Sequence, residues 1–431
     1  MGNKRCLIKD IIVGEDARLS GFISNIRDKK SICFLVLRDI SGELQLTIDK
    51  HIHTELNDAI AKLTLESVIT VEGKVIANTS VKLNGVEMLV ENIKIESIAE
   101  ANPIIDPDTS IDKRLDYRWI DLRDKKKTLM FQVQTVFVEA CRQFLLNKRF
   151  VEIHTPKLIS TESESGAGVF TVDYFGRKAF LAQSPQFYKQ MAMAAGLERI
   201  FEIGPVFRAE KSNSRKHATE FSGMDIEVSY IDSYKDLMCL EEDMLIYAFT
   251  KVKTTYGDKI KQLWNVDVII PAKPFPVVSL HDLYKDLKNM YDYDVIQTEQ
   301  GDMTTDAERL CERYAKDKFN SEFLFVDGFN KNNRAFYHMH EGEIACGYDL
   351  IWKGVEITTG AQREHRYDIL KQQAEEKGLH DDVKDYLEFF RYGCPQHGGF
   401  GIGIDRITLL LFDTTIKEAM FLFRGPDRLN P

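Results

Sequence analysis

The chain has 431 residues, of which 44% are apolar and 29% charged. This balance fits two or three globular domains and excludes a disordered chain, a fibrous repeat and a small disulfide scaffold. The 57 basic and 67 acidic residues leave a net charge of −10, which argues against a non-specific nucleic-acid coat but permits a local basic surface. The seven cysteines are scattered without a CxxC pair, and the sequence has no membrane-spanning run, secretory signal or lipidation motif. We therefore expect a cytoplasmic protein with reduced thiols and no membrane partner.

Residues 1–100 are expected to form a small β-barrel domain. Five short, mostly alternating segments indicate strands, and a helical stretch, Thr54–Leu63, lies between the third and the fourth. This arrangement fits a barrel of the oligonucleotide-binding (OB) type, although any five-stranded barrel or sandwich fits the pattern equally well. The expected strands are Ala17–Ile26, Ile32–Leu37, Glu43–Ile48, Ser67–Ile76 and Val86–Ile95.

The rest of the chain is expected to be a linker or hinge followed by a larger domain. Two prolines in the segment 101–108 predict a linker, which we extend over residues 101–127. Apolar residues at helical spacing predict a helix over Thr128–Leu146. Strands and helices then alternate through residues 128–431, with an expected insertion at about 271–329.

Two segments of the larger domain are candidates for binding a phosphorylated ligand. In the first, Arg208 and Glu210 follow an expected strand, a polar run leads to His217, and Phe221 opens the returning strand. Arginine forks bind phosphate and aromatic rings stack on bases, yet a solvated hairpin loop explains these residues as well. In the second, alternating glycines from Gly399 lead into a helix that carries Arg406 near its start. The glycines would let another group approach the backbone closely, and the start of the helix would attract an anion. A glycine-rich strand packed under a helix explains the pattern as well.

Two further pairs of residues complete the set of candidates. Asp349 and Glu356 lie seven residues apart on expected neighbouring strands, where two carboxylates can hold Mg²⁺ with phosphate oxygens or can simply face solvent. Lys189 and Arg363 are cations that would suit an acidic substrate if they shared a pocket.

In order and spacing, these segments resemble the class II aminoacyl-tRNA synthetases of the aspartyl, asparaginyl and lysyl subgroup, most closely the aspartyl branch of the archaeal and eukaryotic type. The run Phe150–Pro156 resembles motif 1, with Arg149 where glycine is usual. Residues 207–227 resemble motif 2, and residues 399–406 resemble motif 3. The resemblance implies an α+β fold, in which an antiparallel sheet flanked by helices follows the OB-type barrel, and a homodimer formed through motif 1.

The resemblance also implies the roles of the site residues. Arg208 would hold the α-phosphate of ATP and Arg406 the γ-phosphate, and both are the expected catalytic residues. Phe221 and Arg406 would enclose the adenine, with Glu210 and His217 beside the nucleotide. Mg²⁺ would be held by Asp349, Glu356 and Thr359, the last at a position that is commonly serine. An ionised carboxylate needs no protein base to attack phosphorus, which agrees with a site of arginines, carboxylates and metal.

The amino acid implied is L-aspartate. In aspartyl enzymes a lysine and an arginine at the positions of Lys189 and Arg363 bind the substrate's side-chain carboxylate, whereas asparaginyl enzymes have an apolar residue in place of the lysine. Gln186 and Asp225 match positions that bind the substrate's ammonium group, and Glu164 belongs to a matched mobile loop, residues 163–166. The segment His397–Gly401 instead resembles the asparaginyl form, so an asparagine–tRNA ligase and an enzyme that also charges tRNA-Asn remain alternatives.

The barrel would then bind the anticodon of tRNA-Asp. By resemblance, Phe34 stacks on a base while Gln45 and Glu91 read the central U, although the alternation around Phe34 fits a core position too. A paralogue that makes a free amino acid is disfavoured by the presence of the barrel. A non-catalytic tRNA-binding paralogue is disfavoured because Arg208, Arg406 and the metal carboxylates are all present.

Overall fold

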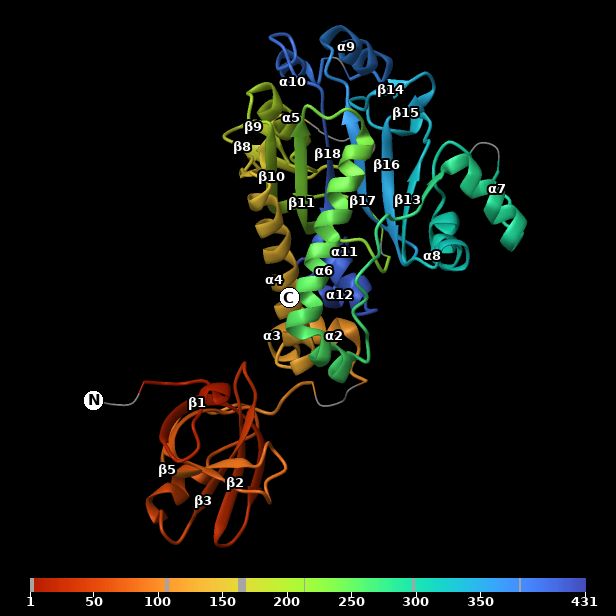
Figure 1. Cartoon of the computed structure of the whole chain (residues 1–431). Coiled ribbons are helices and arrows are strands. Elements are labelled where there is room, and N and C mark those ends of the chain that lie inside the picture. Colours follow the sequence, from red (N-terminus) through yellow and green to blue (C-terminus); the bar gives the residue numbers. More distant parts are fainter. Residues whose placement is uncertain (1–3, 105–107, 162–167, 213, 297–298, 380) are drawn as a thin grey trace. The chain divides into compact units, whose positions relative to one another are not determined.

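The computed structural model describes residues 4–104, 108–161, 168–212, 214–296, 299–379 and 381–431. Its contacts divide the chain into two compact units, Met1–Arg123 and Asp124–Pro431 (Figure 1). Within the ranges just given, no helix combines the length and the apolar character needed to cross a membrane.

The smaller unit is built on a closed five-stranded barrel. Its strands are β1 (Asp16–Asp28), β2 (Ile32–Arg38), β3 (Glu43–Asp49), β4 (Val68–Ala77) and β5 (Val86–Ser97), and the short helix α1 (Asn57–Ile60) lies between β3 and β4. The barrel closes in the order β1-β2-β3-β5-β4. Alternate residues such as Leu35, Leu46 and Val71 are fully buried inside it, because successive side chains of a strand point to opposite faces. The predicted OB-type barrel is confirmed.

Two short helices follow the barrel, within the segment expected to be a linker. They are α2 (Ile111–Asp116) and α3 (Arg118–Asp121). Ser110 caps α2 by accepting a hydrogen bond from the backbone N–H of Lys113. Arg123 pairs with Glu66 at 2.9 Å and lies over the ring of Phe22, so these helices belong to the barrel unit. The structural division therefore falls at residue 123, whereas we expected a linker over 101–127.

The larger unit contains an eight-stranded sheet, which confirms the α+β class. Its strands are β6 (Val151–Glu152), β10 (Arg199–Phe207), β11 (Glu220–Ser229), β12 (Val277–Ser279), β13 (Phe323–Asp327), β16 (Gly347–Trp352), β17 (Val355–Arg363) and β18 (His397–Gly403). The order is β12-β13-β16-β17-β18-β11-β10-β6, antiparallel except for the outermost pairs at each edge. Two small sheets accompany it, made of β7 (Leu158–Ile159), β8 (Thr171–Tyr174) and β9 (Arg177–Leu181), and of β14 (His340–Glu341) and β15 (Ile344–Ala345).

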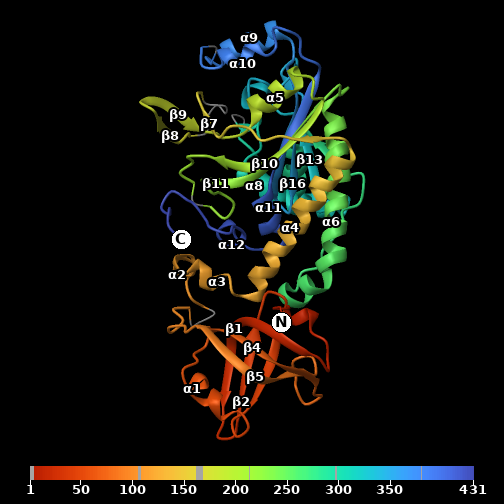
Figure 2. The ribbon, with the colours of Figure 1, turned by 90° about the vertical axis from the view of Figure 1, so that its left-hand side faces the viewer.

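Long helices cover one face of this sheet. Helices α4 (Lys125–Asn147) and α6 (Tyr234–Trp264) run side by side in Figures 1 and 2, and Phe137 of α4 meets Phe249 of α6 with ring centroids 5.6 Å apart. Ser233 and Asp236 form a capping box at the start of α6. The remaining helices are α5 (Gln186–Ala194), α7 (Leu280–Tyr291), α8 (Thr305–Phe319), α9 (Tyr367–Glu376), α10 (Lys384–Glu388), α11 (Ile404–Leu411) and α12 (Ile416–Ala419).

The segment expected as an insertion, 271–329, extends the main sheet. It supplies strands β12 and β13, and β13 pairs antiparallel with β16. Phe323 and Phe325 of β13 pack toward Phe275, whereas Leu324 and Val326 pack with α7 and α8. Helices α7 and α8 therefore cover the face of the sheet opposite α6, at its β12–β13 edge.

Candidate functional site

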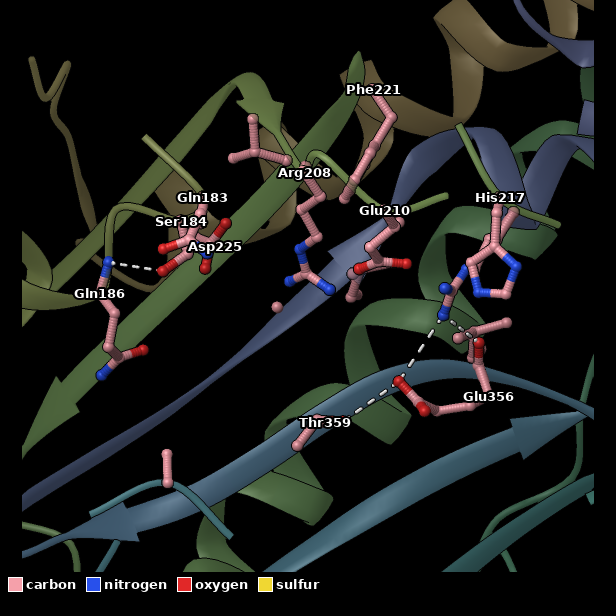
Figure 3. Close-up of a pocket in the computed structure, with 18 of the residues that line it drawn as sticks. Gln183, Ser184, Gln186, Arg208, Glu210, His217, Phe221, Asp225, Glu356 and Thr359 are labelled. Atoms are coloured by element: carbon pink, nitrogen blue, oxygen red, sulfur yellow. Dashed lines mark hydrogen bonds and ion pairs between the residues drawn. The ribbon is translucent and has the colours of Figure 1, made fainter. Parts of the chain in front are cut away.

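A cavity of about 540 Å³ opens on the main sheet and collects most of the candidate residues. The strands and helices around it come from parts of the sequence that are up to about two hundred residues apart. In Figure 3, Arg208 and Glu210 face Glu356 and Thr359 across this space, with His217 at one end and Gln186 at the other. The candidates lining it are Gln186, Lys189, Arg208, Glu210, His217, Phe221, Asp225, Glu356, Thr359, Arg363 and Arg406.

The β10–β11 hairpin places an arginine over an aromatic ring, as the sequence predicts. Arg208 follows the last residue of β10, and its backbone N–H donates to the Thr219 carbonyl at 2.9 Å. Its guanidinium carbon lies 5.6 Å from the centre of the Phe221 ring. Its Nε is buried and has no hydrogen-bond partner among the described residues. A buried donor left unpaired in a cavity is suited to an anionic ligand.

The polar loop of this hairpin ends at a neutral histidine. His217 Nδ1 lies 3.1 Å from Ser212 Oγ and 2.5 Å from Ser214 Oγ. Burial and the nearby positive charge of Arg406 lower the pKa of His217. The imidazole is therefore uncharged at neutral pH and can donate or accept a hydrogen bond beside the cavity.

The two carboxylates of the β16–β17 hairpin lie together, joined by a hydroxyl. Thr359 Oγ1 is 2.9 Å from Asp349 Oδ1 and 3.2 Å from Glu356 Oε1. Arg334 donates to both oxygens of Asp349, at 2.9 and 2.7 Å. Burial raises the pKa of Asp349 to about 6. The pKa of Glu356 is held below its usual value, because Arg406 and Arg334 outweigh the opposing effect of burial.

Arg406 sits beside this cluster at the start of α11. Its Nη1 donates to the Glu356 carbonyl oxygen at 2.9 Å and lies 3.6 Å from Glu356 Oε1. Three oxygen-bearing side chains thus converge next to an arginine, and hard oxygen donors are what Mg²⁺ prefers. Among the described residues no group of three or more His, Cys, Asp or Glu side chains is placed to hold a metal ion. The donor set fits an ion whose remaining ligands are phosphate oxygens and water.

At the other end of the cavity, Lys189 and Arg363 converge on one carboxylate. Lys189 Nζ lies 3.3 Å from Glu227 Oε2 and 3.0 Å from Asp225 Oδ1. Arg363 Nε donates to Glu227 Oε1 at 3.0 Å. Burial acts to raise the pKa of Glu227, but Arg363 and Lys189 more than offset it and lower the pKa. The two cations that the sequence singled out do share a pocket, with Glu227 as their common counter-ion.

A glycine makes room for that counter-ion. A Cβ on Gly399 of β18 would overlap the carboxylate of Glu227 and the carbonyl oxygen of Ile226. The close backbone approach inferred for the glycine-rich strand is thus present, and here the approaching group is a side chain. The resemblance places Glu227 only within motif 2, because its role depends on contacts with residues 189 and 363 that the sequence does not reveal.

A chain of hydrogen bonds behind the pocket orients Gln186. His397 Nδ1 donates to the Pro395 carbonyl at 2.8 Å, so its Nε2 accepts from Gln190 Nε2 at 3.0 Å. Gln190 Oε1 in turn accepts from Gln186 Nε2 and from the Tyr386 hydroxyl, both at 2.9 Å. Burial lowers the pKa of His397 to about 4, which keeps it in the neutral form that this chain needs. We had not predicted this network. Glu164 and the other loop residues, 163–166, lie outside the described residues.

The barrel carries a separate polar cluster on its outer face. Cys33 and Leu35 point into the core, so Phe34 between them points outward, with the guanidinium of Arg27 5.4 Å from its ring centre. Gln45 accepts from Arg27 at 3.3 Å and donates to Glu87 Oε2 at 3.0 Å. The alternative that Phe34 is a core residue is therefore wrong.

Glu87, and not Glu91, is the acid beside Gln45. The β3–β5 register pairs Gln45 with Glu87, and Glu91 lies four residues further along β5, about 13 Å away at strand spacing. Glu87 is 4% exposed, and Thr47 and Asn78 also donate to it. Burial acts to raise the pKa of Glu87, yet these hydrogen bonds lower it. Gln45 and Glu91, both expected to read the central U, therefore do not lie side by side, although Glu87 and Glu91 alternate onto the same face of β5.

Comparisons with known proteins agree over nearly the whole chain. A family model described as "tRNA synthetases class II (D, K and N)" matches residues 110–424, and one described as "OB-fold nucleic acid binding domain" matches residues 17–96. The aspartate–tRNA(Asp/Asn) ligase of Methanopyrus kandleri is 40% identical over 427 residues, which cover 97% of this chain and 96% of the relative. The aspartate–tRNA(Asp) ligase of Pyrococcus abyssi is 36% identical over 434 residues, covering 98% of each chain.

Solved structures also match over nearly the whole chain. An asparaginyl-tRNA synthetase from Pyrococcus horikoshii complexed with asparaginyl-adenylate superposes with a TM-score of 0.91 at 28% identity, covering 99% of this chain and 100% of that one. An aspartyl-tRNA synthetase from Entamoeba histolytica superposes with a TM-score of 0.87 at 30% identity, covering 100% of this chain and 93% of that one.

Proposed function

Because the chain belongs to the class II aminoacyl-tRNA synthetases of the aspartyl, lysyl and asparaginyl group, we propose that it ligates L-aspartate to tRNA-Asp, with ATP as co-substrate. The reaction passes through an aspartyl-adenylate. The relatives from Methanopyrus kandleri and Pyrococcus abyssi are aspartate–tRNA ligases, and they share 40% and 36% of their aligned residues with this chain.

The observation that carries the choice of amino acid is the pair of cations around Glu227. Lys189 is 1% exposed and Arg363 is 3% exposed. Together they offer two buried positive charges at the end of the cavity away from Glu356. A side-chain carboxylate satisfies such charges, whereas an amide leaves a buried cation without an anionic partner, which is costly.

The chemistry needs positioning and charge neutralisation. The α-carboxylate of aspartate attacks the α-phosphorus of ATP, a bond to that carboxylate oxygen forms, and the bond to the bridging oxygen breaks to release pyrophosphate. Arg208, with its unpaired Nε, is placed to bind the α-phosphate, and Arg406 the γ-phosphate. Phe221 offers a face for the adenine, with Glu210 and His217 beside it. Gln186 and Asp225 hold the substrate's ammonium group. In a water-poor cavity such fixed charges stabilise the charge that develops on the phosphates.

Mg²⁺ fits the cluster of Asp349, Glu356 and Thr359. The ion would neutralise phosphate charge and favour departure of pyrophosphate. In the chain itself, Arg334 fixes Asp349, and the Thr359 hydroxyl joins Asp349 to Glu356. We further propose that the barrel binds the tRNA anticodon through Phe34 and Gln45, with Glu87 as the acid in place of Glu91. The enzyme then acts as a cytoplasmic homodimer in translation.

A second tRNA specificity is supported by the names of two relatives. The relative from Methanopyrus kandleri and one from Methanocaldococcus jannaschii are named as ligases for tRNA(Asp/Asn). The competing proposals are an enzyme that charges both tRNAs with aspartate and an asparagine–tRNA ligase. Aminoacylation of purified tRNA-Asp and tRNA-Asn with labelled aspartate and asparagine separates all three.

A variant tests the pocket itself. Lys189→Leu removes one partner of a buried charge pair, which typically costs about 2 to 5 kcal/mol. We expect the KM for aspartate in aspartate-dependent pyrophosphate exchange to rise at least thirtyfold, with the KM for ATP little changed. Lys253→Leu, at an exposed position on α6, is the control. A wild-type enzyme that activates asparagine in preference to aspartate would refute the proposal.

A further inference from the structure

Helix α8 contacts two elements that line the cavity through a single carboxylate. Glu308 lies in the first turn of α8, where its backbone N–H donates to the Thr304 carbonyl at 2.9 Å. Its side chain is nearly buried, although it belongs to a segment that the sequence alone suggested was an insertion. None of the roles assigned above involves this residue.

Glu308 holds two elements that line the cavity. Lys216 Nζ, from the β10–β11 loop, lies 2.5 and 2.6 Å from the two oxygens of Glu308. The backbone N–H of Glu356, on β17, donates to Glu308 Oε1 at 2.7 Å. One carboxylate thus joins the nucleotide-binding loop to the strand that carries a proposed metal ligand.

The contact with β17 falls at an irregularity in the sheet. Leu350 pairs with Thr358 and the next residue, Ile351, pairs with Glu356, so β17 has one extra residue at this point. Such a bulge re-aims side chains and leaves a backbone group outside the ladder. Glu308 accepts a hydrogen bond from the backbone N–H of Glu356 at this bulge. It thereby holds the conformation that aims Glu356 at the cavity.

Helix α8 is itself fixed against this hairpin. The turn between β16 and β17 contains Gly354 with φ +70°, and a Cβ there would lie 2.9 Å from the Arg309 carbonyl oxygen. On the other side, Arg215, next to Lys216, donates to the Thr414 carbonyl at 2.7 Å. The β10–β11 loop that carries Lys216 is therefore fixed to the C-terminal segment, and the helix that carries Glu308 is fixed to the β16–β17 hairpin.

We propose that Glu308 is a positioning residue for the nucleotide site, acting through Lys216 and the backbone of Glu356. The segment 271–329 is then part of the ATP-binding machinery. Loss of Glu308 frees a long lysine side chain on the loop between β10 and β11 and leaves the bulge without its acceptor. Both changes weaken binding of Mg²⁺–ATP because the lysine side chain and the bulge must become ordered again when the ligand binds. This role rests on the proposed function only in that the ligand of the cavity is ATP.

The test compares Glu308→Ala, which removes both contacts, with Glu308→Gln, which keeps an oxygen for the Glu356 N–H. Glu312→Gln, exposed one turn further along α8, is the matched control. Binding of a non-hydrolysable ATP analogue with Mg²⁺ is measured by calorimetry on the full chain. We expect its Kd to rise about tenfold in Glu308→Ala, less in Glu308→Gln and not in Glu312→Gln.

Kinetics separate positioning from a general structural effect. In pyrophosphate exchange we expect the KM for ATP to follow the Kd while the KM for the amino acid stays within twofold. The double variant with Glu308→Gln and Lys216→Met should have a Kd for the ATP analogue within twofold of that of whichever single variant binds it more weakly. An unchanged or lowered Kd, equal rises in both KM values, or additive losses would overturn the proposal. If the Kd rises as expected but only asparagine is activated, the positioning role stands and the choice of aspartate fails.

Discussion

At the scale of single residues, His397 shows how burial sets a protonation state that the pocket depends on. Its ring donates to one carbonyl and accepts from one amide, and a protonated ring could not accept. The pKa of His397 is about 4 in the folded protein, below the value of 6.5 in the unfolded chain. Its contribution to the free energy of unfolding is therefore complete only above pH 6.5. This stability is lost as the pH falls toward 4.

We therefore expect the free energy of unfolding to fall on acidification partly through His397. By linkage the residue accounts for about 2 kcal/mol of loss between pH 7.5 and pH 5. His397→Gln has no titrating ring and should lose correspondingly less over this range. Urea unfolding of both proteins at the two pH values measures the difference. Equal losses in the two proteins would show that His397 does not titrate as a buried neutral ring.

Glu356→Gln tests the metal cluster. The substitution removes one negative charge but keeps the size of the side chain, so we expect weaker binding of Mg²⁺ on the phosphates. Aspartate-dependent pyrophosphate exchange should fall roughly tenfold or more, equivalent to at least about 1.4 kcal/mol. The half-saturating Mg²⁺ concentration should rise, with tRNA binding unchanged. Glu343→Gln, at an exposed acid, should behave as wild type. A normal rate with a normal Mg²⁺ titration would rule out the cluster as the metal site.

The sequence predicted residues with a distinctive local pattern better than residues defined by their neighbours. Arg208, Phe221 and Arg406 lie in recognisable segments, and the structure brings them to one cavity. Glu227 and Glu308 make contacts with residues about 40 to 140 positions away, and their local sequence does not reveal these partners. Strand pairing likewise decides that Glu87, and not Glu91, lies beside Gln45, which the local sequence does not reveal.

At the scale of secondary structure, the end of α4 explains why Arg149 stands out in motif 1. Phe150 N–H donates to the Leu145 carbonyl and Arg149 N–H to the Leu146 carbonyl, at 3.1 and 3.0 Å. This is a Schellman ending, and Arg149 occupies its left-handed position with φ 65°. Only glycine adopts that conformation without steric strain.

Arg149→Gly should therefore stabilise the protein even though it removes an exposed side chain. We expect a gain of about 0.5 to 1 kcal/mol, since relief of strain exceeds the added freedom of the unfolded chain. Arg149→Ala keeps the Cβ and should give no gain. Chemical denaturation of the three proteins provides the measurement. A gain in the alanine variant equal to that in the glycine variant would show that the side chain, and not the backbone, is responsible.

Alternation along β2 separates Phe34, the residue proposed to bind tRNA, from its core neighbour Leu35. Phe34→Ala changes the outer face, where stacking on a base is worth about 1 to 3 kcal/mol. We expect the KM for tRNA to rise about tenfold or more, with aspartate activation and melting temperature nearly unchanged. Leu35→Ala, in the barrel core, should instead lower stability by about 2 to 5 kcal/mol. Loss of activation in Phe34→Ala would argue against an anticodon role.

The barrel strands were predictable because each buries one face, which imposes alternation over its length. Helices α2 and α3 were missed because they are only six and four residues long, too short for a periodic pattern. Strands β12 and β13 were placed in an insertion because their membership of the main sheet depends on pairing with β16. Local periodicity identifies elements, but long-range pairing decides which sheet they join.

At the scale of the whole molecule, an edge of the main sheet suggests how two chains meet. The terminal strand β6 pairs with β10, and Val151 on it is 47% exposed. Exposed edge strands readily pair with another chain, and a two-fold axis would bring two copies of β6 together. We expect sedimentation equilibrium at micromolar concentration to give the mass of two chains. Val151→Lys should shift this toward one chain, and a wild-type mass of one chain would contradict the proposed dimer.

The counter-ion between Lys189 and Arg363 changes how selectivity should be understood. Lys189 and Arg363 share the carboxylate of Glu227, and Lys189 also pairs with Asp225, the group proposed to receive the substrate's ammonium. Together these four side chains carry no net charge. In the proposed complex, aspartate brings a positive ammonium to Asp225 and a negative side chain to the two cations, so the pocket stays neutral. Asparagine would bring the ammonium alone and leave one positive charge in excess. Selectivity for the acid is then a matter of charge balance over the whole pocket.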